Sequence, residues 1–175
     1  HLERPRKTWV QLPELLDGAC RELAETAVGQ KVNPVREYEE GIPPVEGDAS
    51  QLAMAFTNLL SNAIEAMPDG GTLTLRIFTT GPEGLQVEIQ DSGSGIREEL
   101  QEHLFKPFIT TKIGGTGLGL WTARRIIEAH HTGRLVIDSV PGKGAVVRVW
   151  MPTRSPTSTV LREVVNHGTS RNSDR

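Results

Sequence analysis

The chain has 175 residues and carries 19 Lys and Arg against 22 Asp and Glu, for a formal net charge of −3 at pH 7. This length predicts one domain with a proper core, and the mild acidity without a basic run gives no support for a nucleic-acid or membrane surface. The single cysteine, Cys20, excludes a disulfide framework and is expected to be a small core residue. Because no apolar run could span a bilayer and no signal peptide is recognisable, we expect a soluble, cytoplasmic chain.

The first third of the chain predicts a short strand, a helix and a second strand. Residues 9–12 favour the short strand, and residues 13–28 favour a helix with a proline in its first turn and apolar residues at helical spacing. Residues 31–38 favour a strand, and the proline within it places that strand at a sheet edge. A loop is expected over residues 39–47.

A long helix is expected after Asp48, because Asp48 and Gln51 have the form of a capping box. Its apolar residues fall on one arc of the helix, and they are Leu52, Ala55, Phe56, Leu59, Leu60, Ala63, Ala66 and Met67. Asn58, Asn62 and Glu65 recur at i, i+4 and i+7 along one edge of that arc. This polar stripe is either a solvated helix edge or, because carboxamide oxygens are hard ligands, a place to hold Mg²⁺ beside phosphate oxygens.

The rest of the chain predicts two hairpins and two further helices. The expected strands cover residues 72–79, 85–90, 134–140 and 145–151, and the expected helices cover residues 97–104 and 118–130. With the helices on one face of a mixed sheet, the pattern predicts an α/β sandwich. From Thr153 onward Ser, Thr, Arg and Asn dominate, so we expect a disordered tail with at most one helical turn, at 161–165.

A lone carboxylate, Asp91, directly follows the strand at 85–90, and Gly93 and Gly95 follow it in turn. The glycines allow a sharp turn and the close approach of a ligand to the backbone. In isolation this is either an ordinary turn or the floor of a pocket, where a carboxylate can accept a hydrogen bond from an exocyclic amine such as that of adenine.

Four glycines in six residues, Gly114, Gly115, Gly117 and Gly119, lead into the helix expected from 118. Such a loop exposes backbone N–H groups and places the positive end of a helix dipole beside an anion. Lys112 adds a point charge suited to phosphate. The glycine spacing and the absence of a preceding buried strand exclude a Rossmann loop, and the chain has no Walker A motif.

Four stretches in this order resemble the motifs of one family. They are Asn58-Leu-Leu-Ser-Asn-Ala-Ile-Glu-Ala66, Asp91-Ser-Gly-Ser-Gly-Ile96, Phe105-Lys-Pro-Phe108 and Gly114-Gly-Thr-Gly-Leu-Gly-Leu120. They look like the N, G1, F and G2 boxes of the sensor histidine kinase ATP-binding domain, in the gyrase, Hsp90, histidine kinase and MutL superfamily. The short lid before the last motif is most similar to the nitrogen-regulation subgroup.

The resemblance implies a two-layer sandwich of the Bergerat type, with a mixed, mostly antiparallel sheet of about five strands covered on one face by three helices. It covers residues 8–152, the expected catalytic domain. Residues 1–7 are then the end of a linker from a dimerisation domain outside this chain, and 153–175 are the polar tail.

The resemblance also implies ATP and Mg²⁺ as cofactors. Asp91 would bind the adenine amine, Asn62 the metal, and Asn58 and Lys112 the reacting phosphates, while Phe105 and Phe108 would position the lid. The whole implied ATP-binding set is Asn58, Asn62, Asp91, Gly93, Gly95, Ile96, Phe105, Thr111, Lys112, Gly115, Thr116, Gly117, Leu118 and Gly119.

One position separates the reaction classes of the superfamily. Its ATPases and serine kinases have Glu where this chain has Asn58, and Asn cannot act as a general base at neutral pH. Glu65 lies downstream and is a weak substitute. This favours transfer of the γ-phosphate to an imidazole, for relay to a response regulator Asp. A serine kinase of the anti-sigma-factor type and a degenerate nucleotide-binding module are the alternatives.

The imidazole itself is expected elsewhere, because none of the five His is followed by Glu or Asp as a phosphorylated His would be. We therefore expect the acceptor on a dimerisation domain outside this chain, a monomeric fragment and a homodimeric full-length protein, which could be membrane-anchored.

Two features depart from the family pattern, at Ala145 and at residues 131–133, and Trp121 has an expected orientation of its own. Ala145 replaces a common Thr or Ser, which predicts the loss of a hydroxyl near adenine. His131-Thr132-Gly133 replaces a glycine pair, which we interpret as loop variation only. Trp121 is expected to point away from the apolar arc of its helix, toward either a neighbouring segment or the dimerisation helices.

Overall fold

Five strands form one layer of the molecule, in the order β2–β4–β5–β7–β6. The structure is a computed structural model, and it describes residues 5–26, 28–108 and 116–153. The strands are β2 (Val32–Tyr38), β4 (Gly71–Thr79), β5 (Gly84–Asp91), β6 (Arg134–Ser139) and β7 (Ala145–Pro152). Only β2 and β4 run parallel, and the other neighbours are antiparallel. The predicted mixed sheet is confirmed, with β2 at its edge.

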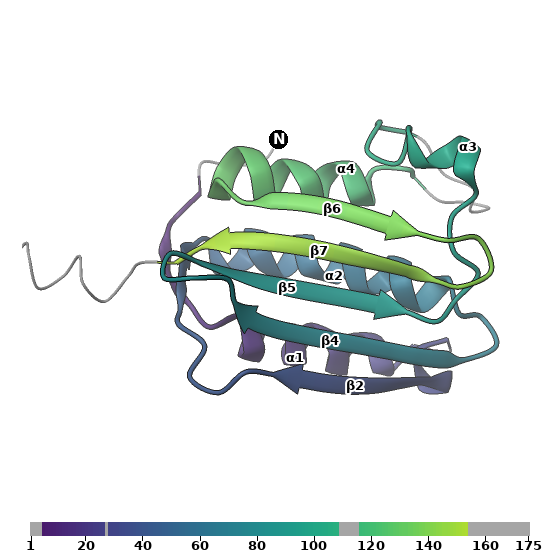
Figure 1. Cartoon of the computed structure of the whole chain (residues 1–175), viewed down its shortest axis with the longest axis horizontal. Helices are drawn as coiled ribbons and strands as arrows, with labels where there is room; N and C mark the ends of the chain where they lie inside the picture. Colours follow the sequence, from purple (N-terminus) through teal and green to yellow (C-terminus); the bar gives the residue numbers. More distant parts are fainter. Residues whose placement is uncertain (1–4, 27, 109–115, 154–175) are drawn as a thin grey trace, which may run out of the picture.

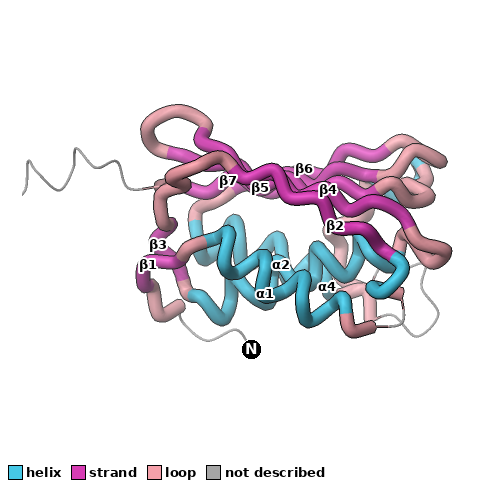
Figure 2. The backbone as a smooth tube through the Cα atoms, turned by 90° about the horizontal axis from the view of Figure 1, so that it is seen from below, coloured by secondary structure: helices cyan, strands magenta, loops and turns pink. Residues whose placement is uncertain are grey.

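Helices on one face of this sheet form the second layer (Figures 1 and 2). They are α1 (Leu12–Ala24), α2 (Ala49–Glu65) and α4 (Gly119–Arg124), and α4 continues as a π-helical segment, Arg125–His130. A short helix, α3 (Glu98–Gln101), and a 3-10 turn, Gly29–Lys31, complete the described helical elements. The three covering helices were all predicted, and so was the sandwich.

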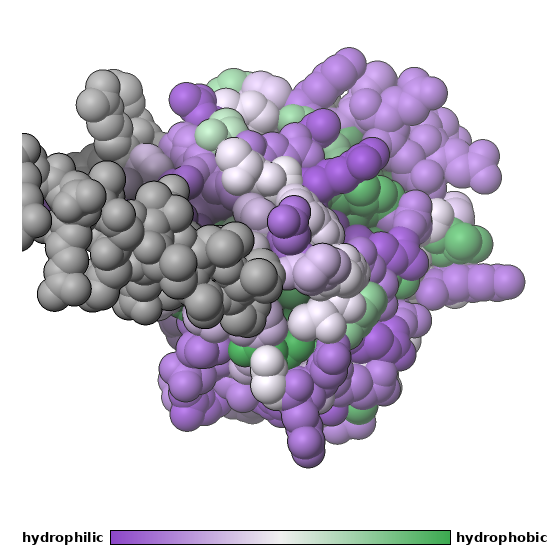
Figure 3. Space-filling model, turned by 60° about the vertical axis from the view of Figure 1, so that its left-hand side comes forward, coloured by the Kyte–Doolittle hydropathy of each residue, from purple (hydrophilic) through white to green (hydrophobic). Residues whose placement is uncertain are grey.

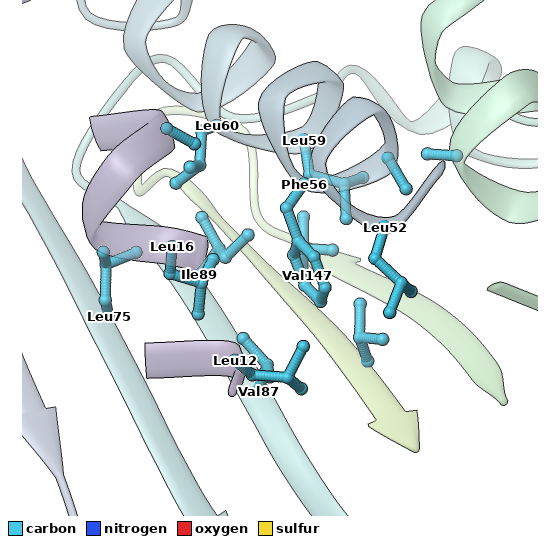
Figure 4. Close-up of a cluster of buried hydrophobic side chains, with 14 of the residues drawn as sticks. Leu12, Leu16, Leu52, Phe56, Leu59, Leu60, Leu75, Val87, Ile89 and Val147 are labelled. Carbon is cyan, nitrogen blue, oxygen red and sulfur yellow. The ribbon is translucent and has the colours of Figure 1, made fainter. Parts of the chain in front are cut away.

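The core lies between the layers because strands and helices each turn one apolar face inward. Figure 4 shows Leu52, Phe56 and Leu59 of α2 above Val87 and Val147 of β5 and β7. Phe56 and Val87 are fully buried, and Cys20 of α1 is buried as predicted. Burying each large apolar side chain stabilises the fold by about 1.5–3 kcal/mol, so this interface provides much of the driving force.

The described residues place no helix over the opposite face of the sheet, which carries alternating charges instead. Arg76 bonds Glu37 at 2.5 Å, and Arg148 bonds Glu88 at 3.0 Å and also pairs with Asp138. Each partly exposed pair contributes little stability, but together they satisfy a face that meets solvent.

Three expected boundaries were wrong. A strand β3 (Val45–Gly47) forms inside the expected loop, because it pairs antiparallel with β1 (Thr8–Val10). Helix α1 ends at Ala24, and α3 is only four residues long. Apart from Thr153, the predicted tail lies outside the described residues. In the described ranges, no helix combines the length and apolarity needed to cross a membrane.

Candidate active site

The candidate site lies where β5 ends beside α2 and the start of α4. Asp91 is the last residue of β5 and belongs to its inward face, so its side chain is 5% exposed. Asp91 Oδ1 accepts the backbone N–H of Gly93 at 2.9 Å. Burial raises the pKa of Asp91, and the N–H groups of Gly93 and Ala145 partly oppose this by stabilising the charged form. The strand thus presents a desolvated carboxylate.

Two glycines let neighbouring backbone close around this carboxylate. Gly144 has φ +84°, and a Cβ placed there would lie 2.0 Å from the backbone oxygen of Asp91. A Cβ on Gly93 would lie 2.4 Å from the carbonyl oxygen of Ala66, at the end of α2. Side chains at either position would therefore push the β6–β7 turn or α2 away from Asp91.

The turn after Asp91 is also tied to the β6–β7 hairpin. The N–H of Ile96 donates to Ser139 Oγ at 2.8 Å, and this hydroxyl donates to the carbonyl of Gly144 at 3.0 Å. Gln101 Nε2 donates to the carbonyl of Ile96 at 3.0 Å. A Cβ on Gly95, whose φ is +67°, would lie 2.3 Å from the carbonyl oxygen of Val140. Sequence reasoning missed Ser139 and Gln101, for which no local pattern gives a signal.

A cavity of about 290 Å³ opens beside this turn. Asp91, Gln101, Ser139, Lys143 and Ala145 are among its lining residues. Small-molecule sites commonly occupy about 300–1,000 Å³; the lining of this cavity includes Asp91 but no residue of α2 or of 116–119.

The asparagine edge of α2 faces the glycine loop. A Cβ on Gly119, the first residue of α4, would lie 3.8 Å from Oδ1 of Asn58. Asn58 and Asn62 are both half-buried, which argues against a merely solvated helix edge. Glu65 is exposed and its Oε1 accepts the Ser61 hydroxyl at 2.6 Å, so this carboxylate is engaged along the helix surface.

The two ends of the lid segment are joined. The N–H of Phe108 donates to the carbonyl of Gly117 at 3.0 Å, and both residues have φ +66°. Beyond this pair, the N–H of Leu118 donates to Thr116 Oγ1 at 3.4 Å. The predicted site residues Thr111, Lys112 and Gly115 lie outside the described residues.

Two of the aromatic residues singled out from the sequence, Phe105 and Trp121, meet arginines of the last helix, Arg124 of α4 and Arg125 of the π-helical segment. The guanidinium of Arg124 lies 4.6 Å from the ring centre of Phe105, and that of Arg125 lies 5.4 Å from the ring centre of Trp121. Such cation–π contacts contribute about 0.5–1 kcal/mol at exposed sites. Through this contact, Phe105 connects the segment before the lid to α4, the helix that follows the lid.

The family is decided by comparison with known proteins. A model described as histidine kinase-, DNA gyrase B-, and HSP90-like ATPase matches residues 47–155. This chain belongs to that family. Within it, the chain is the ATP-binding catalytic domain of a two-component sensor histidine kinase, as its relatives and solved neighbours indicate.

Among the relatives, sporulation kinase A of Bacillus subtilis is 38% identical over 149 residues, covering 85% of this chain and 24% of that protein. The sensory histidine kinase/phosphatase NtrB of Rhodobacter capsulatus is 36% identical over 160 residues, covering 85% of this chain and 44% of NtrB. The chain therefore spans less than half of these relatives.

Solved histidine kinases share the fold of this domain. The catalytic domain of histidine kinase ThkA superimposes with a TM-score of 0.75 at 31% identity, covering 85% of this chain and 96% of that one. ThkA in complex with the response regulator protein TrrA gives a TM-score of 0.72 at 27% identity, covering 86% of this chain and 42% of that one.

The structure brings residues of the G1 and G2 boxes against α2, the helix that carries the N box. Asn58 stands against Gly119, and Ala66 at the end of the same helix accepts the N–H of Ser94 at 3.2 Å. In the described part of the chain, no three His, Cys, Asp or Glu side chains gather in a way that could hold a metal ion.

Proposed function

We propose that this kinase domain binds ATP with Mg²⁺ and transfers the γ-phosphate to a histidine on a dimerisation domain outside the chain. The observation that carries the proposal is the buried carboxylate of Asp91, set at a strand end beside the β6–β7 turn and the end of the asparagine helix. A desolvated carboxylate needs a donor, and the exocyclic amine of adenine is a donor of the right kind.

Each group has one role in this proposal. Asp91 accepts from the adenine amine, and burial, which raises the pKa of its carboxyl, places that acceptor out of bulk water. Asn58, against Gly119, lines the phosphate site, and the N–H groups from Gly115 to Gly119 are assigned to the phosphate oxygens at the start of α4. Ile96, Gly93, Gly95, Thr116 and Leu118 shape the walls.

Magnesium fits the donor set of α2. Mg²⁺ keeps several waters and takes few protein ligands, so one carboxamide oxygen from Asn62 with phosphate oxygens is sufficient. When bound, the ion neutralises charge on the phosphates. We assign Lys112 and Thr111 to the same phosphates from their place in the motif alone.

The histidine acceptor follows from the absence of a suitable base on α2. Asn58 cannot take a proton from a hydroxyl, and the Glu65 carboxylate is bonded to Ser61. A neutral imidazole needs no such base, because it is already nucleophilic. A serine kinase and a nucleotide-binding module without transfer remain the alternatives to be tested.

We further propose the setting of the domain. Its limits are residues 8–152, supported by the first strand at Thr8 and the last at Pro152. Partners are a dimerisation domain and, supported by the ThkA–TrrA complex, a response regulator. We place the domain in the cytoplasm, where ATP is available, as a monomer when isolated and a homodimer in the whole kinase.

The nucleotide site is tested first by calorimetric titration with ATP and Mg²⁺. Replacing Asp91→Asn retains the shape but removes the charge and presents a donor to the adenine amine. The loss of a charged hydrogen bond is worth about 1.5–3 kcal/mol, so the dissociation constant should rise about 10–150-fold. Asp17→Asn is the matched control, because Asp17 lies on α1, pairs with Arg36 at 2.6 Å and belongs neither to the cavity lining nor to the proposed ATP-binding set. Equal binding by the two variants would refute the role of Asp91.

Transfer is tested with γ-labelled ATP after a dimerisation domain from a sensor histidine kinase is joined ahead of His1. Acid-labile label on that domain supports the histidine kinase. Acid-stable label on serine supports the first alternative. No label, with ATP bound and with the donor kinase itself active in parallel, supports the module without transfer.

A further inference from the structure

A groove of about 470 Å³ lies between α1 and α2 and begins at β1. Its lining is mostly apolar or small, with Val10, Leu15 and Ala53 among the walls. A Cβ placed on Gly18 would meet no heavy atom within 4 Å, so the groove is open at its middle. The exposed carboxylates of Glu14 and Glu22 stand along its α1 side.

We propose that residues 160–165 of this same chain dock in the α1–α2 groove. This inference is independent of the nucleotide site, because none of the groove residues belongs to the proposed ATP-binding set. Docked there, the segment would contact β1, α1 and α2.

The route of the chain supports this occupant. Thr153 pairs with Val45 of β3, and Val45 pairs on its other side with Val10 of β1, which lines the groove. Two strand spacings, about 10 Å, thus separate the last described residue from the mouth of the groove. Figure 2 shows β1 and β3 at one end of α1 and α2. Residues 154–159 can span about 20 Å when extended, which is enough to reach it.

The sequence of the segment matches the groove. Val160, Leu161, Val164 and Val165 are the apolar residues of 154–175 other than prolines, and at i, i+1, i+4 and i+5 they share one helix face. Residues 154–175 carry four Arg against one Glu and one Asp, so their side chains are net basic. Basic side chains flanking an apolar face complement a groove edged by two glutamates.

The size of the groove favours a short segment over a broad interface. Figure 3, which turns the left-hand end of the Figure 1 view forward, shows hydrophobic groups as small separate patches among hydrophilic ones on its visible part. A stable protein–protein interface needs about 800 Å² on each partner. A short apolar segment carried by the chain needs far less, because its attachment supplies a high effective concentration.

Paramagnetic broadening in the complete 175-residue chain tests the proposal. A nitroxide is placed at Thr159→Cys in a Cys20→Ala background, and amide signals are recorded with the label oxidised and reduced. We expect the amides of Gly18 and Ala53 to lose most of their intensity. Gly18→Trp should fill the groove and restore the Ala53 amide signal, whereas Gly18→Ala should leave that signal broadened.

A second pair of variants tests the segment without touching the fold. Leu161→Asp with Val164→Asp should abolish the broadening, and added salt should weaken it by screening Glu14 and Glu22. Broadening that is absent, or that survives both Gly18→Trp and the double substitution, overturns the proposal. Broadening seen only between differently labelled molecules also overturns it, in favour of a second copy as the occupant.

Discussion

His131 joins the last helix to the start of α2 and is the basis of our most detailed prediction. Its ring is 1% exposed, with Nδ1 2.8 Å from the carbonyl oxygen of Ile126 and Nε2 accepting the N–H of Asp48 at 2.9 Å. A carbonyl only accepts and a backbone N–H only donates, so Nδ1 carries the proton and the ring is neutral. The Asp48 carboxylate caps α2 through the N–H groups of Ser50 and Gln51.

Replacing His131→Ala leaves two backbone groups without partners in an enclosed place. Each buried group left unsatisfied costs about 1–3 kcal/mol, and the vacated ring volume adds a cavity term. We expect a loss of about 3–5 kcal/mol in the free energy of unfolding, a large part of a domain's stability.

The loss should depend on pH with a definite sign. Burial lowers the pKa of His131 below the ordinary value of 6.5, and the nearby Lys7 lowers it further. Between the two pKa values the unfolded chain binds a proton that the folded chain resists, so the stabilisation falls as pH decreases below about 6.5. Above that pH the stabilisation is complete. The gap between wild type and His131→Ala should therefore narrow from pH 7.5 to pH 5.

Urea unfolding followed by circular dichroism at both pH values measures this gap. With an ordinary dependence on denaturant, the midpoint at pH 7.5 should fall by about 2 M in the variant. His130→Ala is the control, because His130 is half-buried and its Nδ1 meets one partner, Gln51 Oε1, at 2.8 Å. A gap below about 1 kcal/mol at pH 7.5, or one equally wide at pH 5, would refute this account.

Four other substitutions have defined outcomes. Thr132→Gly should raise the free energy of unfolding by about 0.5–1 kcal/mol, because φ +54° strains a β-branched residue; urea unfolding measures it. Gly144→Ala should lower it by about 2–4 kcal/mol, since its Cβ would meet the Asp91 backbone. Asp91→Asn should unfold at higher urea than wild type at pH 7, and the difference should vanish in acid, because a raised pKa means that ionisation destabilises the fold. Ala145→Thr places a hydroxyl beside Asp91, its cross-strand partner, and should tighten ATP binding about 2–10-fold by calorimetry.

Local signals in the sequence were sufficient for most of the fold. The apolar arc of α2, the alternation of β5 and the Asp48 cap each depend on residues close together in the chain, and each is confirmed. Strand β3 could not be predicted in this way. Its three residues follow two prolines and become a strand only because β1, more than thirty residues earlier, provides hydrogen-bond partners.

The residues of the candidate site also divide into those that local sequence signals predicted and those that depend on long-range contacts. Asp91 and its glycines were predicted from the motif, and the structure gives the reason for Gly93 in the close approach of α2. The interpretation of residues 131–133 as loop variation was wrong, because His131 is buried and bonded at both ring nitrogens. The capping box was also only half right, since the N–H of Asp48 goes to His131. Long-range hydrogen bonds of this kind leave no periodic pattern in the sequence, so they could not be predicted from it.

These contacts make α2 the element on which site and fold depend together. Its first turn is fixed through Asp48 to His131, its apolar arc fills the core, and Ala66 at its end contacts the turn that follows Asp91. A rigid helix transmits a shift at one end to the other, so a change at the His131 junction can displace Asn58 relative to Gly119 without touching either. Weaker ATP binding in His131→Ala at a temperature where the variant is fully folded would reveal that coupling, whereas unchanged binding would mean that the core alone holds α2 in place.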